Sequence, residues 1–231
     1  MQALDIRSIA IPPLGCGNGG LDWADVKPMI EAAFAALPDV DVRTSRPQMT
    51  IGRAAILKSI DTCRDLNYRL TKIEVQKLGY FLQAAGQDLG LQFEKHLYGP
   101  YSEQLRHALN RMEGHFIVGM GDGSVDSEIE PAPDALREAN DFLATNGDAE
   151  INARLDRLQS LIDGFQSPYG MELLASVHWV AEHEPEVASP VTALQAIGNW
   201  NPRKKRLMKA EHVHASWERL SDTGWINSKT Q

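Results

Sequence analysis

Four glycines lie within the six residues 15–20, after a short β-branched segment that ends at Pro12 and Pro13. Glycine adopts backbone angles that other residues avoid, and it has no side chain to block a ligand. A loop of this kind between a strand and a helix directs several backbone N–H groups at an anion, and the helix amino terminus adds a favourable dipole. A tight strand-to-helix connection alone needs fewer glycines, so the loop predicts a diphosphate-binding site.

The same loop also has the spacing of a dinucleotide-binding fingerprint, with Gly15, Gly17 and Gly20 in a G-x-G-x-x-G pattern. Asp39 and Asp41 lie near the offset expected for an acid that binds ribose. Three features argue against a Rossmann fold. Prolines occupy the end of the first strand, the acids fall at the beginning and middle of the second strand, and no further βα units follow.

The elements that must position the loop form one β–loop–α–β unit. Residues 8–11 are typical of a buried strand, and Asp22 is a suitable N-cap for a helix from about Trp23 to Leu37. Residues 40–42 alternate and predict a second strand. Such a unit should be parallel and right-handed. A boundary falls near residues 44–49, where the apolar period becomes helical.

After this boundary the pattern predicts helices almost throughout. Thr50, Thr71 and Ser102 are expected caps, and residues 96–101 are expected to form a turn. Short extended segments at 115–118 and 225–226 each follow a group of helices, which is the outline of paired winged-helix units. The expected helices cover residues 50–60, 72–89, 103–112, 133–147, 151–162, 168–183, 190–197 and a last one that contains Val213, Trp217 and Leu220 and ends at Gly224.

The net charge of −8 comes from one stretch, since residues 122–163 hold eleven acidic and three basic side chains and the rest of the chain balances. A field of this sign repels nucleic acid and attracts a basic protein surface. The alternative is a solvated helical face that keeps the protein soluble. The acids at the start of the stretch are the candidate contacts with a partner: Asp122, Asp126, Glu128 and Glu130.

A basic segment offers an alternative function. Arg203, Lys204, Lys205 and Arg206, with Lys209 nearby, are able to contact phosphates, so a winged-helix DNA-binding regulator is the second hypothesis. A solvated charged face is the simpler explanation, and we expect no extensive direct contact with nucleic acid.

Other constellations predict no further chemistry. Two isolated cysteines indicate neither a disulfide framework nor a zinc site, and the histidine spacings indicate no metal. No apolar segment approaches the ~20 residues of a membrane span, and the first residues lack the order of a signal peptide. We therefore expect a cytoplasmic protein without a cofactor.

The segment 8–23, SIAIPPLGCGNGGLDW, resembles the second ADP-ribose-binding loop of macro domains, and in particular that of DarG-type antitoxins of DarT–DarG toxin–antitoxin systems. The later segments KLGYF (77–81), YGPY (98–101), EGH (113–115) and SPYGMELL (167–174) are similar to the carboxy-terminal domain of the same antitoxins. The resemblance thus covers nearly the whole chain.

The resemblance implies an α+β, mostly α chain. Residues 1–47 would be the carboxy-terminal fragment of a macro domain, a partial βαβ unit. Residues 48–126 and 127–231 would be two helical units that resemble paired winged helices.

The resemblance also implies a function. DarT-like toxins attach ADP-ribose to thymine in single-stranded DNA, the macro domain of DarG removes it, and the carboxy-terminal domain binds and blocks the toxin. We therefore expect an antitoxin whose partner is a DarT-like toxin and whose macro domain, when complete, binds ADP-ribose. By position, the diphosphate and distal ribose would be held by Gly15, Cys16, Gly17, Asn18, Gly19, Gly20 and Leu21.

The catalytic part is the point at which this chain departs from the family pattern. The family's catalytic lysine and adenine-binding residues precede the glycine loop, whereas this sequence starts only a few residues before the strand. A two-stranded sheet with one helix cannot bury its faces alone. We therefore expect no catalytic residue in this chain and no hydrolysis by it alone.

Overall fold

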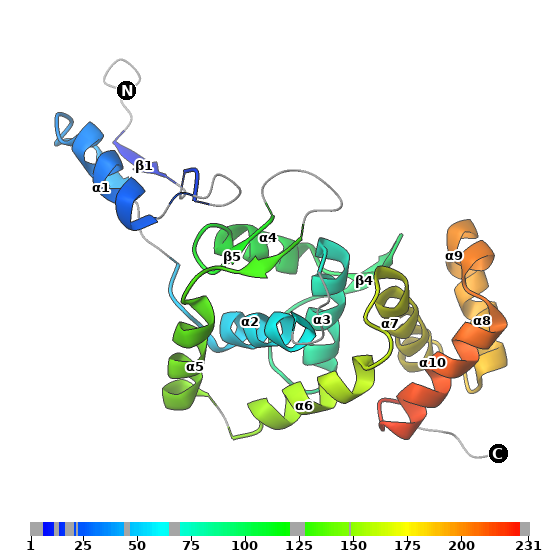
Figure 1. Ribbon diagram of the computed structural model, residues 1–231. Coiled ribbons are helices and arrows are strands. Elements are labelled where there is room, and N and C mark those ends of the chain that lie inside the picture. Colours follow the sequence, from blue (N-terminus) through cyan, green and yellow to red (C-terminus); the bar gives the residue numbers. More distant parts are fainter. Residues whose placement is uncertain are drawn as a thin grey trace.

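The structure, a computed structural model, describes residues 7–11, 14–16, 21, 23–43, 47–64, 70–120, 128–147 and 149–226. Helices dominate these residues and the strands are short, which confirms the mostly α, α+β fold class. Figure 1 shows a small amino-terminal unit, drawn in blue, beside a larger helical part that contains the rest of the chain.

The amino-terminal unit consists of β1 (Ser8–Ala10), α1 (Trp23–Phe34) and β2 (Asp41–Arg43). The two strands pair in parallel, as expected, and Ile9 lies opposite Val42. A parallel pair needs a crossover, which α1 supplies. The helix ends three residues earlier than predicted, because Leu37 precedes a proline that disfavours helical backbone angles.

The helical part begins with α2 (Ile51–Arg64), α3 (Lys72–Ala84) and α4 (Glu103–Met112). The three expected caps are confirmed. The Thr50 hydroxyl accepts a hydrogen bond from the Arg53 N–H at 3.3 Å, Thr71 and Glu74 form a reciprocal capping box, and Ser102 accepts from the Leu105 N–H at 3.3 Å. Each cap satisfies a backbone donor that the helix itself leaves unpaired.

Two antiparallel hairpins accompany these helices. β3 (Glu94–His96) pairs with β4 (Gly99–Tyr101), and β5 (Ile117–Val118) pairs with β6 (Glu130–Pro131). The turn expected at 96–101 is therefore only the tip of the first hairpin. β5 lies within the extended segment predicted at 115–118. β3, β4 and β6 were not predicted, because strands of two or three residues are too short to show a period of two.

Of the remaining helices, α5 and α6 pack against α2, α6 and α7 pack against α3, and α8 and α10 pack against α7. The predicted ranges of α6 and α7 are confirmed to the residue, and the Ser167 and Ser189 hydroxyls cap α7 and α8. The bounds are α5 (Ala135–Asn146), α6 (Ile151–Ile162), α7 (Pro168–His183), α8 (Pro190–Trp200) and α10 (Ala210–Asp222).

One further helix, α9 (Pro202–Leu207), was not predicted. Asn201 caps it by accepting a hydrogen bond from the Lys204 N–H at 2.8 Å, and Pro202 occupies its first turn. Six residues rich in lysine and arginine show no apolar period, so the sequence indicated only a charged segment.

One hydrophobic core runs through the helical part. Its buried residues extend from Ala54 to Ile226 and include Trp179, Trp217 and Trp225. The expected boundaries near 44–47 and at 126–127 fall largely on residues outside the described ranges. The division into two winged-helix units stays a prediction.

No helix among the described residues is both long enough and apolar enough to cross a membrane.

Candidate functional site

The start of the glycine loop adopts a conformation that requires glycine. Gly15 has a φ of +74°, and its carbonyl accepts a hydrogen bond from the Leu21 N–H at 3.0 Å, which closes the loop. A Cβ at Gly15 would lie 2.7 Å from Leu21 Cδ1. The other predicted contacts with ADP-ribose in this loop lie outside the described residues: Gly17, Asn18, Gly19 and Gly20.

Cys16 is buried rather than presented as a nucleophile. It packs with Val26 and Ile30 of α1, and its thiol donates a long hydrogen bond to the Leu14 carbonyl at 3.5 Å. The thiol therefore anchors the loop to the helix. Leu21, by contrast, is 55% exposed.

A cavity of about 1350 Å³ lies between the amino-terminal unit and the helical part. Cys16 and Leu21 line it on one side, together with Trp23 and Ala24, the first two residues of α1. The amino terminus of α1 thus faces the cavity, where the helix dipole favours an anion.

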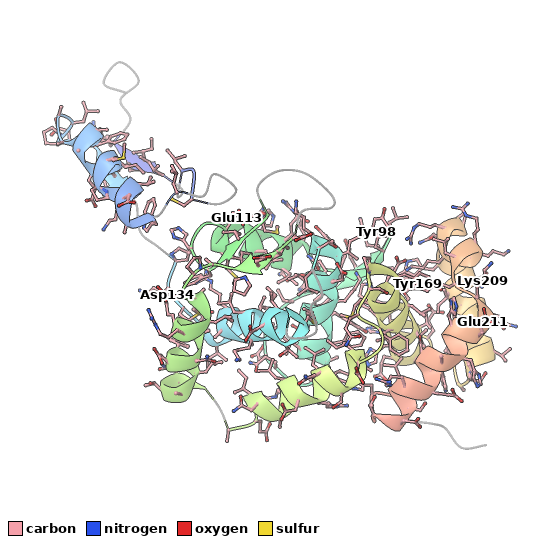
Figure 2. All side chains as sticks on the ribbon, in the orientation of Figure 1. Tyr98, Glu113, Asp134, Tyr169, Lys209 and Glu211 are labelled. Atoms are coloured by element: carbon pink, nitrogen blue, oxygen red, sulfur yellow. The ribbon has the colours of Figure 1, made fainter. Side chains whose placement is uncertain are left out.

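The opposite wall comes from β5, β6 and α5. Trp23 meets His115 edge to face across the cavity, with ring centroids 5.4 Å apart. Figure 2 shows Glu113 and Asp134 on the side of the helical part that faces the amino-terminal unit. The two walls are therefore held together by a specific aromatic contact.

Glu113 stabilises the backbone of this opposite wall. Its carboxylate accepts hydrogen bonds from the N–H groups of Gly119 and Met120, at 3.2 and 3.0 Å. Gly119 has a φ of +107°, and a Cβ there would lie 1.8 Å from the Glu128 carbonyl oxygen, so only glycine fits. This contact fixes the end of β5 against the segment that leads into β6.

Carboxylates dominate the second wall. They are opposed by His115 and by Arg137, which forms an ion pair with Asp134 at 3.1 Å. The two walls therefore suit different parts of a ligand. Backbone N–H groups suit a diphosphate, whereas carboxylates accept hydrogen bonds from ribose hydroxyls. The acids that line the cavity are Glu128, Glu130, Asp134, Glu138 and Asp141.

The structure thus brings two predicted sets of residues to one cavity. Cys16 and Leu21 of the glycine loop share it with Glu128 and Glu130 of the acidic stretch. Asp122 and Asp126, the other two predicted partner contacts, lie outside the described residues.

Sequence reasoning did not single out Trp23, His115 or Arg137 as site residues. The only signals were Trp23 at the end of the loop motif, His115 in the EGH segment and Arg137 as a rare base in the acidic stretch.

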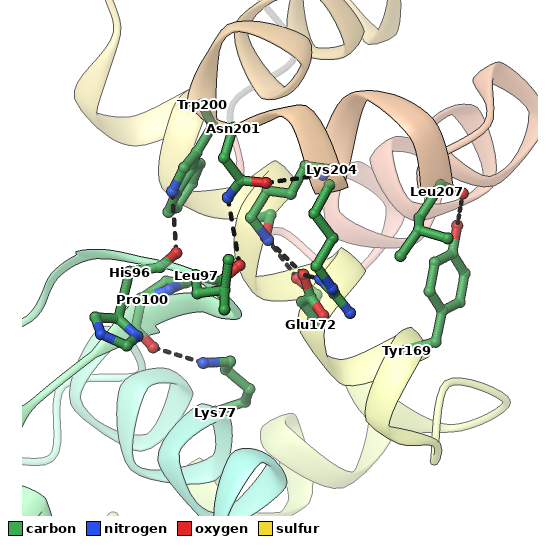
Figure 3. Close-up of polar contacts among 12 residues, drawn as sticks. Lys77, His96, Leu97, Pro100, Tyr169, Glu172, Trp200, Asn201, Lys204 and Leu207 are labelled. Atoms are coloured by element: carbon green, nitrogen blue, oxygen red, sulfur yellow. Dashed lines mark hydrogen bonds and ion pairs between the residues drawn. The ribbon is translucent and has the colours of Figure 1, made fainter.

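Two of the basic residues near residue 203 are used inside the fold, so the segment is not one continuous phosphate-contacting patch. Lys204 is fully buried, and its ammonium donates hydrogen bonds to Glu172 at 2.6 Å and to Ser176 at 2.9 Å. Arg203 donates to the same Glu172 oxygen at 2.6 Å, and Figure 3 shows Lys204 beside Glu172. Only Lys205, Arg206 and Lys209 are exposed. Burial lowers the pKa of Lys204, and Glu172 opposes this effect.

The buried carboxylate of Glu172 therefore holds α9 against α7. Two cations share its oxygen, and such a network is stable only when every charge has a partner. Among the described residues, no group of His, Cys, Asp and Glu side chains is arranged to hold a metal ion.

Comparison with known proteins finds close relatives along nearly the whole chain, although no family model matches it. The chain is 43% identical over 242 residues to a DNA ADP-ribosyl glycohydrolase of Thermus aquaticus, an alignment that covers 97% of this chain and 66% of that protein. It is 39% identical over 249 residues to proteins of the same name from Mycobacterium bovis and Mycobacterium tuberculosis, covering 95% of this chain and 70% of each relative. The chain therefore spans about two thirds of the length of these relatives.

Proposed function

Because this chain belongs to the DNA ADP-ribosyl glycohydrolase family, we propose that it acts in the removal of ADP-ribose from DNA and that the cavity beside Gly15 binds the ADP-ribose. The observation that carries the proposal is the position of the glycine loop. It opens on a cavity whose far wall bears carboxylates, so both kinds of polar group in ADP-ribose find a suitable partner.

The diphosphate would lie at the glycine loop and at the amino terminus of α1, whose dipole favours an anion. Arg137 would add the cationic side chain on the opposite wall. The ribose hydroxyls would donate hydrogen bonds to carboxylates such as Glu128 and Glu130. We propose recognition rather than bond cleavage for these residues, since no lysine lines the described part of the cavity.

Titration calorimetry with ADP-ribose tests this proposal. Gly15→Ala would strain the backbone and push a methyl group against Leu21, so the affinity should fall by about tenfold or more through lost hydrogen bonds to the diphosphate. Gly164→Ala is the matched control, because Gly164 also has a positive φ, +78°, but has no heavy atom within 4 Å of the added carbon. It lies between α6 and α7, away from the cavity.

The proposal predicts that wild type and Gly164→Ala bind ADP-ribose with the same affinity and that Gly15→Ala binds it more weakly. Equal affinities in all three proteins would contradict it. A parallel assay with single-stranded DNA that carries ADP-ribosylated thymine would show whether this chain also releases the ADP-ribose.

We further propose that the protein is an antitoxin and binds a DarT-like toxin through the acidic side of the helical part. The supporting observation is that Glu128, Glu130, the α5 N-cap Asp134 and two acids of α5 lie around one cavity. A surface of this charge complements the basic surface with which a protein contacts DNA.

Co-purification and binding kinetics with the toxin test the antitoxin proposal. Charge reversal of Glu128 and Glu130 to lysine, alone and with Asp122 and Asp126, should slow association and reduce its dependence on salt. The control is Glu211→Lys on α10, which Figure 2 shows at the far side of the molecule. Unchanged association of the reversal variants would exclude the acidic side as the interface.

A further inference from the structure

A second cavity, of about 530 Å³, lies between α3, the β3–β4 hairpin and α4. Its volume is within the range of about 300–1,000 Å³ that is usual for small-molecule sites. Met120 lines this cavity, whereas the preceding residue, Gly119, lines the acidic cavity. The two cavities therefore lie on either side of the segment that follows β5.

The charge of this second cavity is opposite to that of the first. Lys72, Lys77, His96 and Arg106 line it, and none of its described lining residues carries a carboxylate. A basic cavity is unexpected in a protein whose net charge is −8. It favours an anionic ligand.

Lys77 is the most unusual of these residues. It is almost fully buried on α3, and its ammonium donates a hydrogen bond to the Pro100 carbonyl at 2.7 Å (Figure 3). An ammonium has three donors, so this bond leaves capacity for a ligand oxygen. Gly99 of the hairpin has a φ of +96°, which favours glycine, and a Cβ at this position would lie 3.4 Å from Lys77 Cε, so the hairpin backbone lies close to the lysine.

The rest of the wall is aromatic and apolar. His96 and Tyr101 lie ring against ring, with centroids 4.9 Å apart, and Tyr98 lies beside them in the hairpin. Ile73, Leu109 and Met120 add apolar surface. A ligand that satisfies both kinds of wall has an anionic group and a flat ring.

Arg106 is held at the edge of this cavity. Its Nε donates to Glu103 at 2.9 Å, and the Tyr101 hydroxyl donates to the same carboxylate at 2.9 Å. These hydrogen bonds orient the guanidinium. A group that is already fixed loses less entropy when a ligand binds.

We propose that this basic cavity binds a mononucleotide unit, with its phosphate at Lys77 and Arg106 and its base against the aromatic side chains of the hairpin. The unit would be either a free nucleotide or the terminal nucleotide of a single DNA strand. This inference goes beyond the proposed binding of ADP-ribose and does not depend on it, because the two cavities share no lining residue.

Protonation of Lys77 gives the site a distinctive signature. Burial and, to a smaller extent, the charge of Lys204 on α9 lower the pKa of Lys77 to about 7, although Glu172 on α7 opposes both effects. Lys72, His96 and Arg106 are the other basic groups around the cavity. A phosphate next to the ammonium would favour its charged form, so binding at about pH 8 should take up a proton.

Calorimetry with thymidine 5′-monophosphate, in buffers of different ionisation enthalpy, measures both the affinity and the proton uptake. Lys77→Met keeps the shape of the side chain and should weaken binding by about tenfold or more and abolish the proton uptake. Arg106→Gln, a surface change that does not threaten the fold, should weaken binding by a smaller factor. Lys205→Gln, on the exposed face of α9, is the control and should bind as wild type does.

Thymidine and inorganic phosphate, tested separately, should each bind more weakly than the nucleotide. Competition by a 5′-phosphorylated oligothymidylate, but not by its unphosphorylated form, would assign the site to the end of a DNA strand, and its absence would assign the site to a free nucleotide. No binding of the nucleotide by wild type would overturn the proposal, as would full affinity in both Lys77→Met and Arg106→Gln. Phosphate binding as strong as nucleotide binding would exclude a mononucleotide as the ligand. Gly15→Ala should retain nucleotide binding, which separates this result from a failure of the ADP-ribose site.

Discussion

The amino-terminal unit and the helical part are held together very differently. In the described part of the amino-terminal unit, the buried core consists of Cys16, Val26 and Ile30, and the strands have only three residues each. In the latter, one continuous core extends from α2 to Ile226. Burial of apolar side chains is the main stabilising term in folding. Stability therefore lies mainly in the helical part, whereas the predicted ligand loop lies in the small unit.

The two cavities differ in charge. The cavity at the glycine loop has an acidic far wall, whereas the cavity at the β3–β4 hairpin is basic and lined by aromatic side chains. The overall negative charge of the chain therefore does not predict the basic cavity.

The largest expected effect sharpens the contrast in stability. Phe81 is fully buried and packs edge to face against Tyr80, His178 and Trp225, so Phe81→Ala should lower the free energy of unfolding by about 3–5 kcal/mol. Phe34→Ala, in the small and partly open core of the amino-terminal unit, should cost far less. Urea unfolding followed by circular dichroism measures both. Similar losses would show that the two cores are equally important.

The next effect concerns the buried charges that join α9 to α7. Glu172→Gln would leave Lys204 buried beside a neutral amide, and we expect a loss of about 3 kcal/mol. Glu211→Gln, a change in an exposed acid of α10, should leave the melting temperature unchanged. Thermal unfolding of both variants tests this. If Glu172→Gln is as stable as wild type, the network does not hold the helices together.

A smaller, pH-dependent effect also belongs to the helical core. Burial, with His183 and Arg157 adding to it, lowers the pKa of His178 to about 4, and its ring accepts a hydrogen bond from the Tyr80 hydroxyl at 2.7 Å when Nδ1 is unprotonated. The unfolded chain binds this proton below about pH 6.5 and the folded chain only below about pH 4, so stability should fall between these values by up to about 3 kcal/mol.

Comparison with His178→Gln isolates the contribution of this histidine from that of the carboxylates. The difference in free energy of unfolding between wild type and variant should change between about pH 6.5 and pH 4. His214→Gln, at an exposed position on α10, should follow wild type at every pH. A pH-independent difference for His178→Gln would mean that the buried ring is not the titrating group.

Much of the fold could be predicted because its signals are local. Thr71, Ser102 and Ser189 are caps that act on the residues immediately following them, and the apolar period of α6 and α7 marked their full lengths. The short helix α9 carries no such period, so its buried Lys204 was read as part of an exposed patch. Local spacing cannot show that a charged side chain finds its partner on another helix.

The candidate site could be predicted only on the side of the loop. The spacing of Gly15 and the residues after it identified an anion-binding loop, because that chemistry depends on consecutive backbone groups. His115 and Arg137 belong to the opposite wall through tertiary packing, so no spacing in the sequence placed them beside Trp23.

The central claim, that ADP-ribose binds where the glycine loop meets the acidic wall, is tested most directly by hydrogen–deuterium exchange with and without ADP-ribose. We predict slower exchange in peptides that cover residues 14–24 and in those that cover β5, β6 and the first turn of α5. The loss of this protection in Gly15→Ala, but not in Gly164→Ala, would complete the test. Unchanged exchange at residues 14–24 in the presence of saturating ADP-ribose would contradict the account.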